Sequence, residues 1–390
     1  MEQKVVNLFL QIIKFVINGT KLSDEIVSKL DDITVKQLYA LAQKHDLAHF
    51  IALAVKNCDL NLDKGLLQQS KIILAGAVYR YEQKQYCLKH IYELFEKNDI
   101  DFVPLKGAVI AEYYPEPWMR TSCDIDILIK KEQIAKAIQL LQTNEWVLKE
   151  KTVYNDYSLY YKDLVHLELH FNIRETFASL DKVLDKVWDN TEICDGFTHK
   201  LKQNNEFVLF HLLAHMSYHF LGGGCGVRSF IDIWLLSKKM EYDKDKLYQL
   251  CKAANIERFC DSVFNLINVW FGEEKYTQTI MNMEKYVLTG GTYGENNQRI
   301  AVQQIKTGGK VKNVLNRIFM PYGTLVYKYP SLKDKRYLTP IYQIIRWMDA
   351  IKDRRIKTTV KELRINSKLS DETIYQITKL LAEVGLDKLK

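Results

Sequence analysis

The sequence predicts an α+β protein, in which a small mixed β-sheet core is flanked by N- and C-terminal helical domains. Two observations lead to this fold class. Period-two alternation of apolar and polar residues is confined to the stretch 99–173, and helical periodicity dominates the chain on both sides of it. With 390 residues the chain is too long for one ordinary core, so two or three domains are expected.

The changes of pattern divide the chain into four segments. We expect an N-terminal helical domain at 1–98 and the mixed sheet at 99–173. A helical domain at 174–275 would close a cleft over the sheet, and 276–390 would form a basic helical region.

The composition argues against a membrane protein. Hydrophobic residues make up 47% of the chain, but no run reaches the roughly 18 apolar residues that a span requires. The seven cysteines are odd in number and lack CxxC spacing, which argues against a thiolate zinc site and fits the reducing cytoplasm. We therefore expect a cytoplasmic protein with no membrane partner.

The elements follow in order from the local pattern. Residues 1–98 are helical, and Ser23 marks one helix start because it suits an N-cap and is followed by acids. In the core we expect helices at 108–114 and 131–143 and strands at 101–105, 124–129, 146–149, 157–161 and 165–171. Lys162-Asp163 suits a hairpin turn between the last two strands. Helices resume after Arg174 and continue to about 270, and 307–340 is loop-rich and basic.

The most informative motif is Asp124-Ile-Asp126, in an otherwise apolar strand. Because successive strand side chains point to opposite faces, the two carboxylates share one face, and Ile125, Ile127 and Ile129 line the other. Their Cα atoms lie roughly 7 Å apart, so the carboxylates can converge on a hard cation such as Mg²⁺. The alternative is a structural pair that faces Lys or Arg, for which Arg120 is a nearby candidate.

A glycine turn precedes this motif. Lys106-Gly107 follows the strand at 101–105 and opens a short helix. Backbone N–H groups can approach a phosphate closely at such a turn, and Lys106 could add positive charge. A plain strand-to-helix turn is the alternative.

A third acidic residue lies in the strand at 165–171. His166, Glu168 and His170 alternate with apolar residues and therefore share one face. If this strand neighbours the Asp124 strand, Glu168 joins the two aspartates. Three carboxylates with two Mg²⁺ ions can promote in-line attack on the α-phosphorus of a nucleoside triphosphate. His170 could instead be a packed or orienting histidine.

Three histidines recur every four residues along one predicted helix. His211, His215 and His219 cannot all bind one ion, because eight residues of helix span about 12 Å. The His211/His215 pair alone has a spacing found in zinc sites. We expect this histidine face to point into the carboxylate cleft or at another helix. Arg228 and Asp232 follow at i, i+4 and could pair with each other or lie near a nucleotide.

Positive charge is concentrated toward the C-terminus. Between Arg299 and Arg364 there are sixteen Lys or Arg residues and four acids, whereas the whole chain has a net charge of only +7. Such a basic block suits a phosphate-bearing partner, although a solvated surface would look the same.

In combination these motifs resemble the DNA polymerase β-like nucleotidyltransferase superfamily. Its members have a glycine motif at a strand–helix turn, then a D-x-D strand, then a later strand with a third carboxylate. Leu105-Lys-Gly107, Asp124-Ile-Asp126 and Leu167-Glu-Leu-His170 follow that order. Here Ala108 follows the glycine where the superfamily commonly has Ser or Gly, and Glu168 stands where Asp is usual.

Within the superfamily, the chain is most similar to the uncharacterised nucleotidyltransferase family. That family adds a Tyr-Pro loop, an arginine four residues before the DID motif, and a histidine-rich helix followed by R-x3-D. The corresponding residues are Tyr114-Pro115, Arg120, His215 with His219, and Arg228 with Asp232.

The resemblance implies a palm-like nucleotidyltransferase core that transfers a nucleoside monophosphate from an NTP, with ATP as the expected donor, to an acceptor hydroxyl. Asp124, Asp126 and Glu168 would be the catalytic residues and the ligands of two Mg²⁺ ions, which Mn²⁺ could replace. The implied nucleotide-binding residues are Lys106, Gly107, Arg120 and Arg228. The residues expected to line the cleft are His170, His215, His219 and Asp232.

The acceptor and two other functions stay open. The hydroxyl could belong to a small molecule, a protein side chain or an RNA end, and RNA would use the basic block and its tyrosines. The chain could also be a non-catalytic nucleotide- or nucleic-acid-binding regulatory protein that keeps the fold. A zinc hydrolase built on His211 and His215 is the third alternative.

Overall fold

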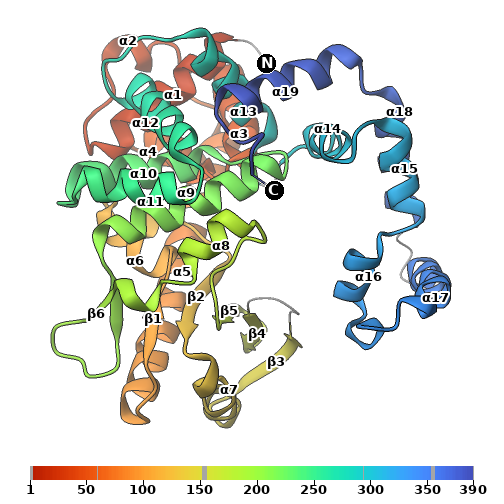
Figure 1. Ribbon diagram of the computed structural model, residues 1–390. Coiled ribbons are helices and arrows are strands. Elements are labelled where there is room, and N and C mark those ends of the chain that lie inside the picture. Colours follow the sequence, from red (N-terminus) through yellow and green to blue (C-terminus); the bar gives the residue numbers. More distant parts are fainter. Residues whose placement is uncertain (1–2, 59, 152–155, 293, 353–355, 390) are drawn as a thin grey trace.

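The protein folds into a helical body with one mixed β-sheet packed at its lower end (Figure 1). The computed structural model describes residues 3–58, 60–151, 156–292, 294–352 and 356–389. Helices precede and follow the sheet in the chain, so the predicted α+β class with helical flanks is confirmed. In the described part of the chain, no helix is both long and apolar enough to cross a membrane.

The sheet has five strands in the order β1-β2-β5-β4-β3. Their bounds are β1 (Phe102–Pro104), β2 (Asp124–Ile129), β3 (Trp146–Lys151), β4 (Asp156–Tyr161) and β5 (Val165–His170). Strands β2 and β5 are parallel, and the other neighbours are antiparallel, which makes the sheet mixed as predicted. Residues 162–164 join β4 to β5, and Lys162 and Asp163 have φ values of 50° and 56°, as the central residues of a type I′ turn require.

The two faces of the sheet differ in character, as the alternation predicts. Ile125, Ile127 and Ile129 of β2 are buried with Leu167 and Leu169 of β5 in an apolar layer. Helices α5 (Lys64–Lys97) and α7 (Ile134–Thr143) cover this layer. Because one face is fully apolar, the register is fixed and the acidic side chains must point the other way.

All secondary-structure elements in the described residues of the N-terminal segment are helices. Besides α5 it contains α1 (Gln3–Ile17), α2 (Asp24–Val27), α3 (Asp32–Lys44) and α4 (Ala48–Asn57). Ser23 precedes α2 as predicted, although its side chain caps no backbone N–H. The short elements between the first strands and before α7 are α6 (Gly107–Ile110), η1 (Ala111–Tyr113), η2 (Pro117–Met119) and η3 (Lys131–Gln133).

The segment after the sheet is mostly helical, with one unpredicted hairpin. Strands β6 (Thr191–Ile193) and β7 (Leu201–Gln203) form this two-stranded sheet, in a stretch expected to be helical. The helical elements are α8 (Ala178–Leu184), η4 (Trp188–Asn190), α9 (Asn205–Leu221), α10 (Val227–Lys239), α11 (Lys244–Ala253), α12 (Glu257–Phe271), α13 (Gln278–Gly290) and α14 (Asn296–Thr307).

One hydrophobic core joins the helices that precede and follow the sheet. Phe9 and Phe50 from the N-terminal helices are buried in it with Phe210, Phe230 and Phe259 from α9, α10 and α12. The segments 1–98 and 174–275 both contribute to this core. The domain boundaries stay a prediction.

The basic C-terminal region departs from the expected loop at 307–340. It contains α15 (Lys310–Ile318), α16 (Tyr322–Lys328), η5 (Pro330–Leu332), η6 (Arg336–Leu338), α17 (Thr339–Lys352), α18 (Ile356–Lys368) and α19 (Asp371–Glu383). Helices α15–α18 extend to one side of the body, and α19 returns to it (Figure 1). The expected loop is therefore wrong for 310–318 and 322–328, where helical spacing outweighs the breaking effect of nearby glycines and a proline.

Two histidines buried in the helical body predict acid lability. His45 and His49 are 0% and 4% exposed, and burial lowers the pKa of each to about 4. At these two sites the unfolded chain therefore binds more protons than the folded protein between pH 6.5 and 4. The free energy of unfolding should fall as the pH drops through this window, by up to about 1.4 kcal/mol per pH unit for each histidine.

Urea unfolding at pH 7, 6 and 5 measures this slope. His49→Gln should remove one histidine's contribution, because the amide can still donate to Met119 O, the acceptor of His49 Nε2 at 2.6 Å. The exposed His90 provides the control, and His90→Gln should leave the slope unchanged. Equal slopes in wild type and His49→Gln would contradict the prediction.

Candidate active site

A strained turn after β1 holds Lys106. The Ala108 N–H donates to Leu105 O at 3.1 Å, and Lys106 has φ 43° and ψ −113°. These angles belong to the first central position of a type II′ turn, which normally takes glycine. At the second position, a Cβ on Gly107 would lie 2.7 Å from Arg120 Nη1. The turn therefore brings the Lys106 ammonium and the Arg120 guanidinium to the start of α6.

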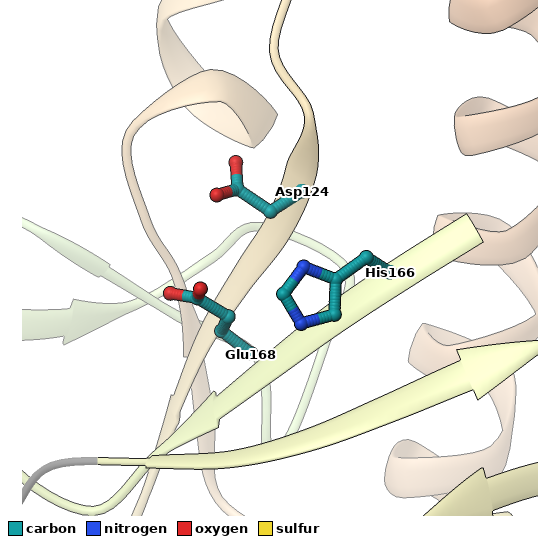
Figure 2. A group of neighbouring side chains, drawn as sticks. All are labelled: Asp124, His166 and Glu168. Carbon is teal, nitrogen blue, oxygen red and sulfur yellow. The ribbon is translucent and has the colours of Figure 1, made fainter. Parts of the chain in front are cut away.

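The parallel pairing of β2 and β5 brings the three predicted carboxylates together. In the register, Asp124 lies opposite His166 and Asp126 lies opposite Glu168. All of these side chains are on the face turned away from the apolar layer. Figure 2 shows Asp124, His166 and Glu168 close to one another. The sequence predicts that Glu168 joins the two aspartates if their strands are neighbours, and β2 and β5 are neighbours in the sheet.

Asp126 is the buried member of the pair, and two cations compensate it. Lys106 Nζ lies 3.0 Å and His170 Nε2 lies 2.9 Å from Asp126 Oδ1, and the residue is 4% exposed. Burial alone would raise the pKa of Asp126, but Lys106 and His170 hold it well below its usual range. Burial likewise opposes the charge on His170, yet Asp126 and Glu168 raise its pKa to about 9. His170 is thus cationic at neutral pH.

Asp124 has the opposite electrostatic balance. Burial raises its pKa, and repulsion from Asp126 and Glu168 adds to the effect. No Lys, Arg or His of the described residues forms an ion pair with Asp124. In contrast, a hydrogen bond from His170 lowers the pKa of Glu168. The face therefore carries negative charge that a bound cation would stabilise.

Two groups of these side chains have ligand atoms close enough to hold a metal ion. Asp124, His166 and Glu168 form one group, and Asp126, Glu168 and His170 form the other, with the ligand atoms of each group within 4.8 Å of one another. Carboxylate oxygens suit Mg²⁺ and Mn²⁺, and Glu168 belongs to both groups. The residues present thus fit one or two divalent ions.

Residues of the sheet and of α9 and α10 line one cavity of about 570 Å³. It receives every predicted site residue except Gly107, namely Lys106, Arg120, Asp124, Asp126, Glu168, His170, His215, His219, Arg228 and Asp232. Gly107 lines a smaller neighbouring pocket that shares Arg120, Ser122 and Asp124 with the cavity.

The histidine face of α9 points into this cavity. His215 Nδ1 lies 2.6 Å from Glu175 Oε1, and His215 Nε2 lies 3.0 Å from His219 Nε2. Burial lowers the pKa of both histidines to about 3, so both imidazoles are neutral. The Nδ1 atom of His211 instead lies 3.4 Å from Gln203 Nε2. Among the described residues, none of the three histidines belongs to a metal-compatible group, so no zinc site is found on this helix.

Arg120 and Asp232 connect the sheet region to α10. Arg120 Nη2 donates to Asp232 Oδ2 at 2.9 Å, and the Tyr114 hydroxyl donates to Asp232 Oδ1 at 2.6 Å. Arg228 contacts Asp46 Oδ2 at 2.7 Å and Thr121 O at 2.8 Å. The suggested i, i+4 pair of Arg228 with Asp232 is therefore wrong, because each finds a partner on another element.

Comparison with known proteins identifies the family. The family model described as uncharacterised nucleotidyltransferase matches residues 31–272, more than half of the chain. The chain belongs to this family. No curated protein and no solved structure matches it. The matched stretch runs from α3 to the end of α12 and contains all of the predicted site residues, whereas the basic C-terminal region lies outside it.

Family membership indicates the general class of reaction at the site. It implies nucleotidyltransferase activity and an NTP substrate, and the acidic group at Asp124 and Glu168 could hold the divalent metal that nucleotidyltransferases generally use. The resemblance stated from the motifs is thus confirmed at the level of the family.

The structure adds site residues that the motifs did not identify. Glu175 lies in the loop after β5 and is identified by its contact with His215 and by its place in the cavity lining. Lys84 of α5 donates to Ser122 Oγ at 2.8 Å, and burial lowers its pKa to about 8 despite the nearby Asp124. His166 was visible in the alternation of β5, but its position opposite Asp124 depends on the strand pairing.

Proposed function

We propose that the protein is a Mg²⁺-dependent nucleotidyltransferase of the cytoplasm. It would transfer a nucleoside monophosphate from an NTP, with ATP as the expected donor, to an acceptor hydroxyl. The observation that carries this proposal is the β2–β5 register, in which Asp124, Asp126 and Glu168 share one face of a cavity in a chain of the nucleotidyltransferase family.

Asp124, Asp126 and Glu168 would hold the divalent ions. When bound, the ions would stabilise the negative charge that develops around the α-phosphorus and would lower the pKa of the attacking hydroxyl. Glu168 faces both aspartates and could also accept the acceptor's proton. Lys106 and His170 would keep Asp126 ionised and correctly oriented for its ion.

The cations around the turn would bind the triphosphate. Lys106 and Gly107 lie at the start of α6, and Arg120 Nη1 is directed at Gly107 while Nε and Nη2 bind Asp232. Arg228 lines the same cavity and would balance charge on the leaving pyrophosphate. The side chains of Lys106, Arg120 and Arg228 already donate to a carboxylate or a backbone oxygen. They would therefore lose little further conformational freedom when the triphosphate binds.

The acceptor is a small molecule, a protein side chain or an RNA end. His215, His219 and Asp232, with the rest of the α9–α10 side of the cavity, would contact it. An RNA acceptor would use the basic block from Arg299 to Arg364, and its binding should weaken steeply with salt. Salt-independent binding would exclude RNA.

A direct test starts with nucleotide binding. Thermal unfolding is measured with each of the four NTPs, with and without Mg²⁺, and stabilisation by ATP only in the presence of Mg²⁺ is expected. Pyrophosphate release and a nucleoside monophosphate adduct, found by mass spectrometry on an acceptor, would then identify the reaction. Stabilisation without pyrophosphate release from any acceptor class would favour the non-catalytic regulatory alternative. No stabilisation by any NTP would contradict the proposal.

A further inference from the structure

The two metal-compatible groups of the site are electrically unequal. Asp126 Oδ1 already contacts Lys106 Nζ at 3.0 Å and His170 Nε2 at 2.9 Å. Among the described residues, no Lys, Arg or His forms an ion pair with Asp124. A cation can therefore reach the Asp124 carboxylate without displacing an ion-pair partner, whereas at Asp126 it competes with Lys106 and His170.

The group around Asp124 contains a nitrogen ligand. His166 lies opposite Asp124 in the β2–β5 register, and its ring is directed toward the carboxylates of Asp124 and Glu168 (Figure 2). This imidazole is the feature that distinguishes the group from an all-oxygen magnesium site, since Mg²⁺ prefers oxygen ligands and imidazole suits transition ions.

Neighbours on β4 fix the orientation of the His166 ring. The ring stacks on Tyr160 with centroids 4.6 Å apart and planes 15° apart, and Nε2 lies 3.0 Å from Ser158 Oγ. If Nε2–H donates to Ser158 Oγ, the remaining nitrogen, Nδ1, carries the lone pair on the side of β2. An outer partner that fixes the tautomer and orientation of a ring is the usual support of a metal-binding histidine.

We propose that Asp124, His166 and Glu168 form a binding site for a divalent transition ion, preferring Mn²⁺ to Mg²⁺, and that Ser158 and Tyr160 position His166 for it. Asp124 and Glu168 contribute one carboxylate oxygen each, and His166 contributes Nδ1. The role of the ion in catalysis rests on the proposed function, but its binding does not.

The preference has a simple physical origin. Replacing a water or carboxylate oxygen by an imidazole nitrogen stabilises a transition ion more than Mg²⁺, and affinity rises from Mn²⁺ to Co²⁺ in the order common to such ligands. Mn²⁺ takes octahedral coordination with carboxylates and water as Mg²⁺ does, so the rest of the site accepts either ion. The change in the ratio of the two affinities when the imidazole is removed therefore reports on the nitrogen ligand.

The test uses the full chain and the metals alone, without nucleotide. Free Mn²⁺ is followed by electron paramagnetic resonance during titration, and Mg²⁺ is measured by its competition with Mn²⁺. We expect wild type to bind Mn²⁺ at least about tenfold more tightly than Mg²⁺. His166→Asn should weaken Mn²⁺ binding by about 10–100-fold and Mg²⁺ binding much less, so that the Mn²⁺/Mg²⁺ affinity ratio falls well below that of wild type.

Two further variants complete the design. Ser158→Ala removes only the orienting hydroxyl and should lower the Mn²⁺ affinity by less than His166→Asn does. His90→Gln, on the exposed face of α5, should bind both ions as wild type does. Circular dichroism and the melting temperature of each metal-free variant establish that it is folded.

The results separate this inference from the proposed function. An unchanged Mn²⁺/Mg²⁺ ratio in His166→Asn would overturn it, and so would the absence of Mn²⁺ binding to wild type. If the Mn²⁺ preference depends on His166 but no NTP is ever consumed, the metal site stands and the nucleotidyltransferase proposal fails. If NMP transfer occurs with equal affinity for both ions, the function stands and this inference fails.

Discussion

Replacing Asp126 by asparagine is expected to abolish NMP transfer, lowering its rate by about 10³-fold or more. A loss of this size corresponds to about 4 kcal/mol of transition-state stabilisation, the scale on which a bound divalent ion acts. Asparagine keeps the shape of the side chain but loses the charge that holds an ion. The same loss is expected for Asp124→Asn, measured as release of labelled pyrophosphate from ATP with Mg²⁺.

The two variants should differ in stability although they share the loss of activity. Asp126→Asn removes the carboxylate that the half-buried Lys106 and the buried His170 share, and leaves His170 with Glu168 at 3.5 Å, which should cost a few kcal/mol of unfolding free energy. Asp124→Asn removes a carboxylate whose pKa is raised by burial and by two like charges, so its ionisation opposes folding at neutral pH. Its unfolding free energy should be equal to that of wild type or higher.

Urea unfolding at pH 7 compares the three proteins. Activity equal to wild type in either variant would remove that aspartate from the catalytic machinery. If Asp124→Asn were the less stable of the two, the account of the charges at this site would be wrong, whatever the activities show.

The local features of the site could be predicted from sequence because they depend only on the alternation of residues within each strand and on the order of the motifs along the chain. Alternation in β2 and β5 assigns Asp124, Asp126 and Glu168 to polar faces, whatever the strands pair with. The Lys106-Gly107 turn is recognisable because a glycine directly follows a strand and opens a helix, although the strained backbone angles belong to Lys106. Conversely, the sequence could not decide whether β2 and β5 are neighbours, and that pairing turns two motifs into one site.

Contacts between distant segments could not be predicted. Arg120 meets Asp232 across 112 positions of chain, and Arg228 meets Asp46 across 182. At the sequence level, Arg228 and Asp232 looked like partners because they are four residues apart on one helix. Packing of α10 against the sheet region gives Asp232 a buried partner in Arg120, and a buried bidentate contact is stronger than an exposed helical pair. Arg228 instead pairs with Asp46, which lies between α3 and α4 and has a side chain 41% exposed.

Removing Asp232 is expected to be among the most destabilising single changes in the chain. In the Arg120–Asp232 ion pair the side chains are 7% and 4% exposed, and Asp232 also accepts from the buried Tyr114 hydroxyl. Asp232→Ala would leave a buried guanidinium and a buried hydroxyl without their acceptor, which typically costs about 3–5 kcal/mol. The measurement is the free energy of unfolding in urea at pH 7.

The chain offers a matched control and a rescue for this prediction. Arg174 and Asp185 also form a close pair, with side chains 53% and 41% exposed, so Asp185→Ala should cost no more than about 1 kcal/mol. The double variant Arg120→Leu/Asp232→Leu replaces both charges by apolar groups and should be more stable than Asp232→Ala, because no buried charge is left alone. If the double variant were as unstable as the sum of its single changes, the guanidinium would contribute by packing alone and not through Asp232. That outcome would also weaken the case for Arg120 Nη1 as a phosphate-binding group, since its direction toward Gly107 is fixed by the bonds of Nε and Nη2 to Asp232.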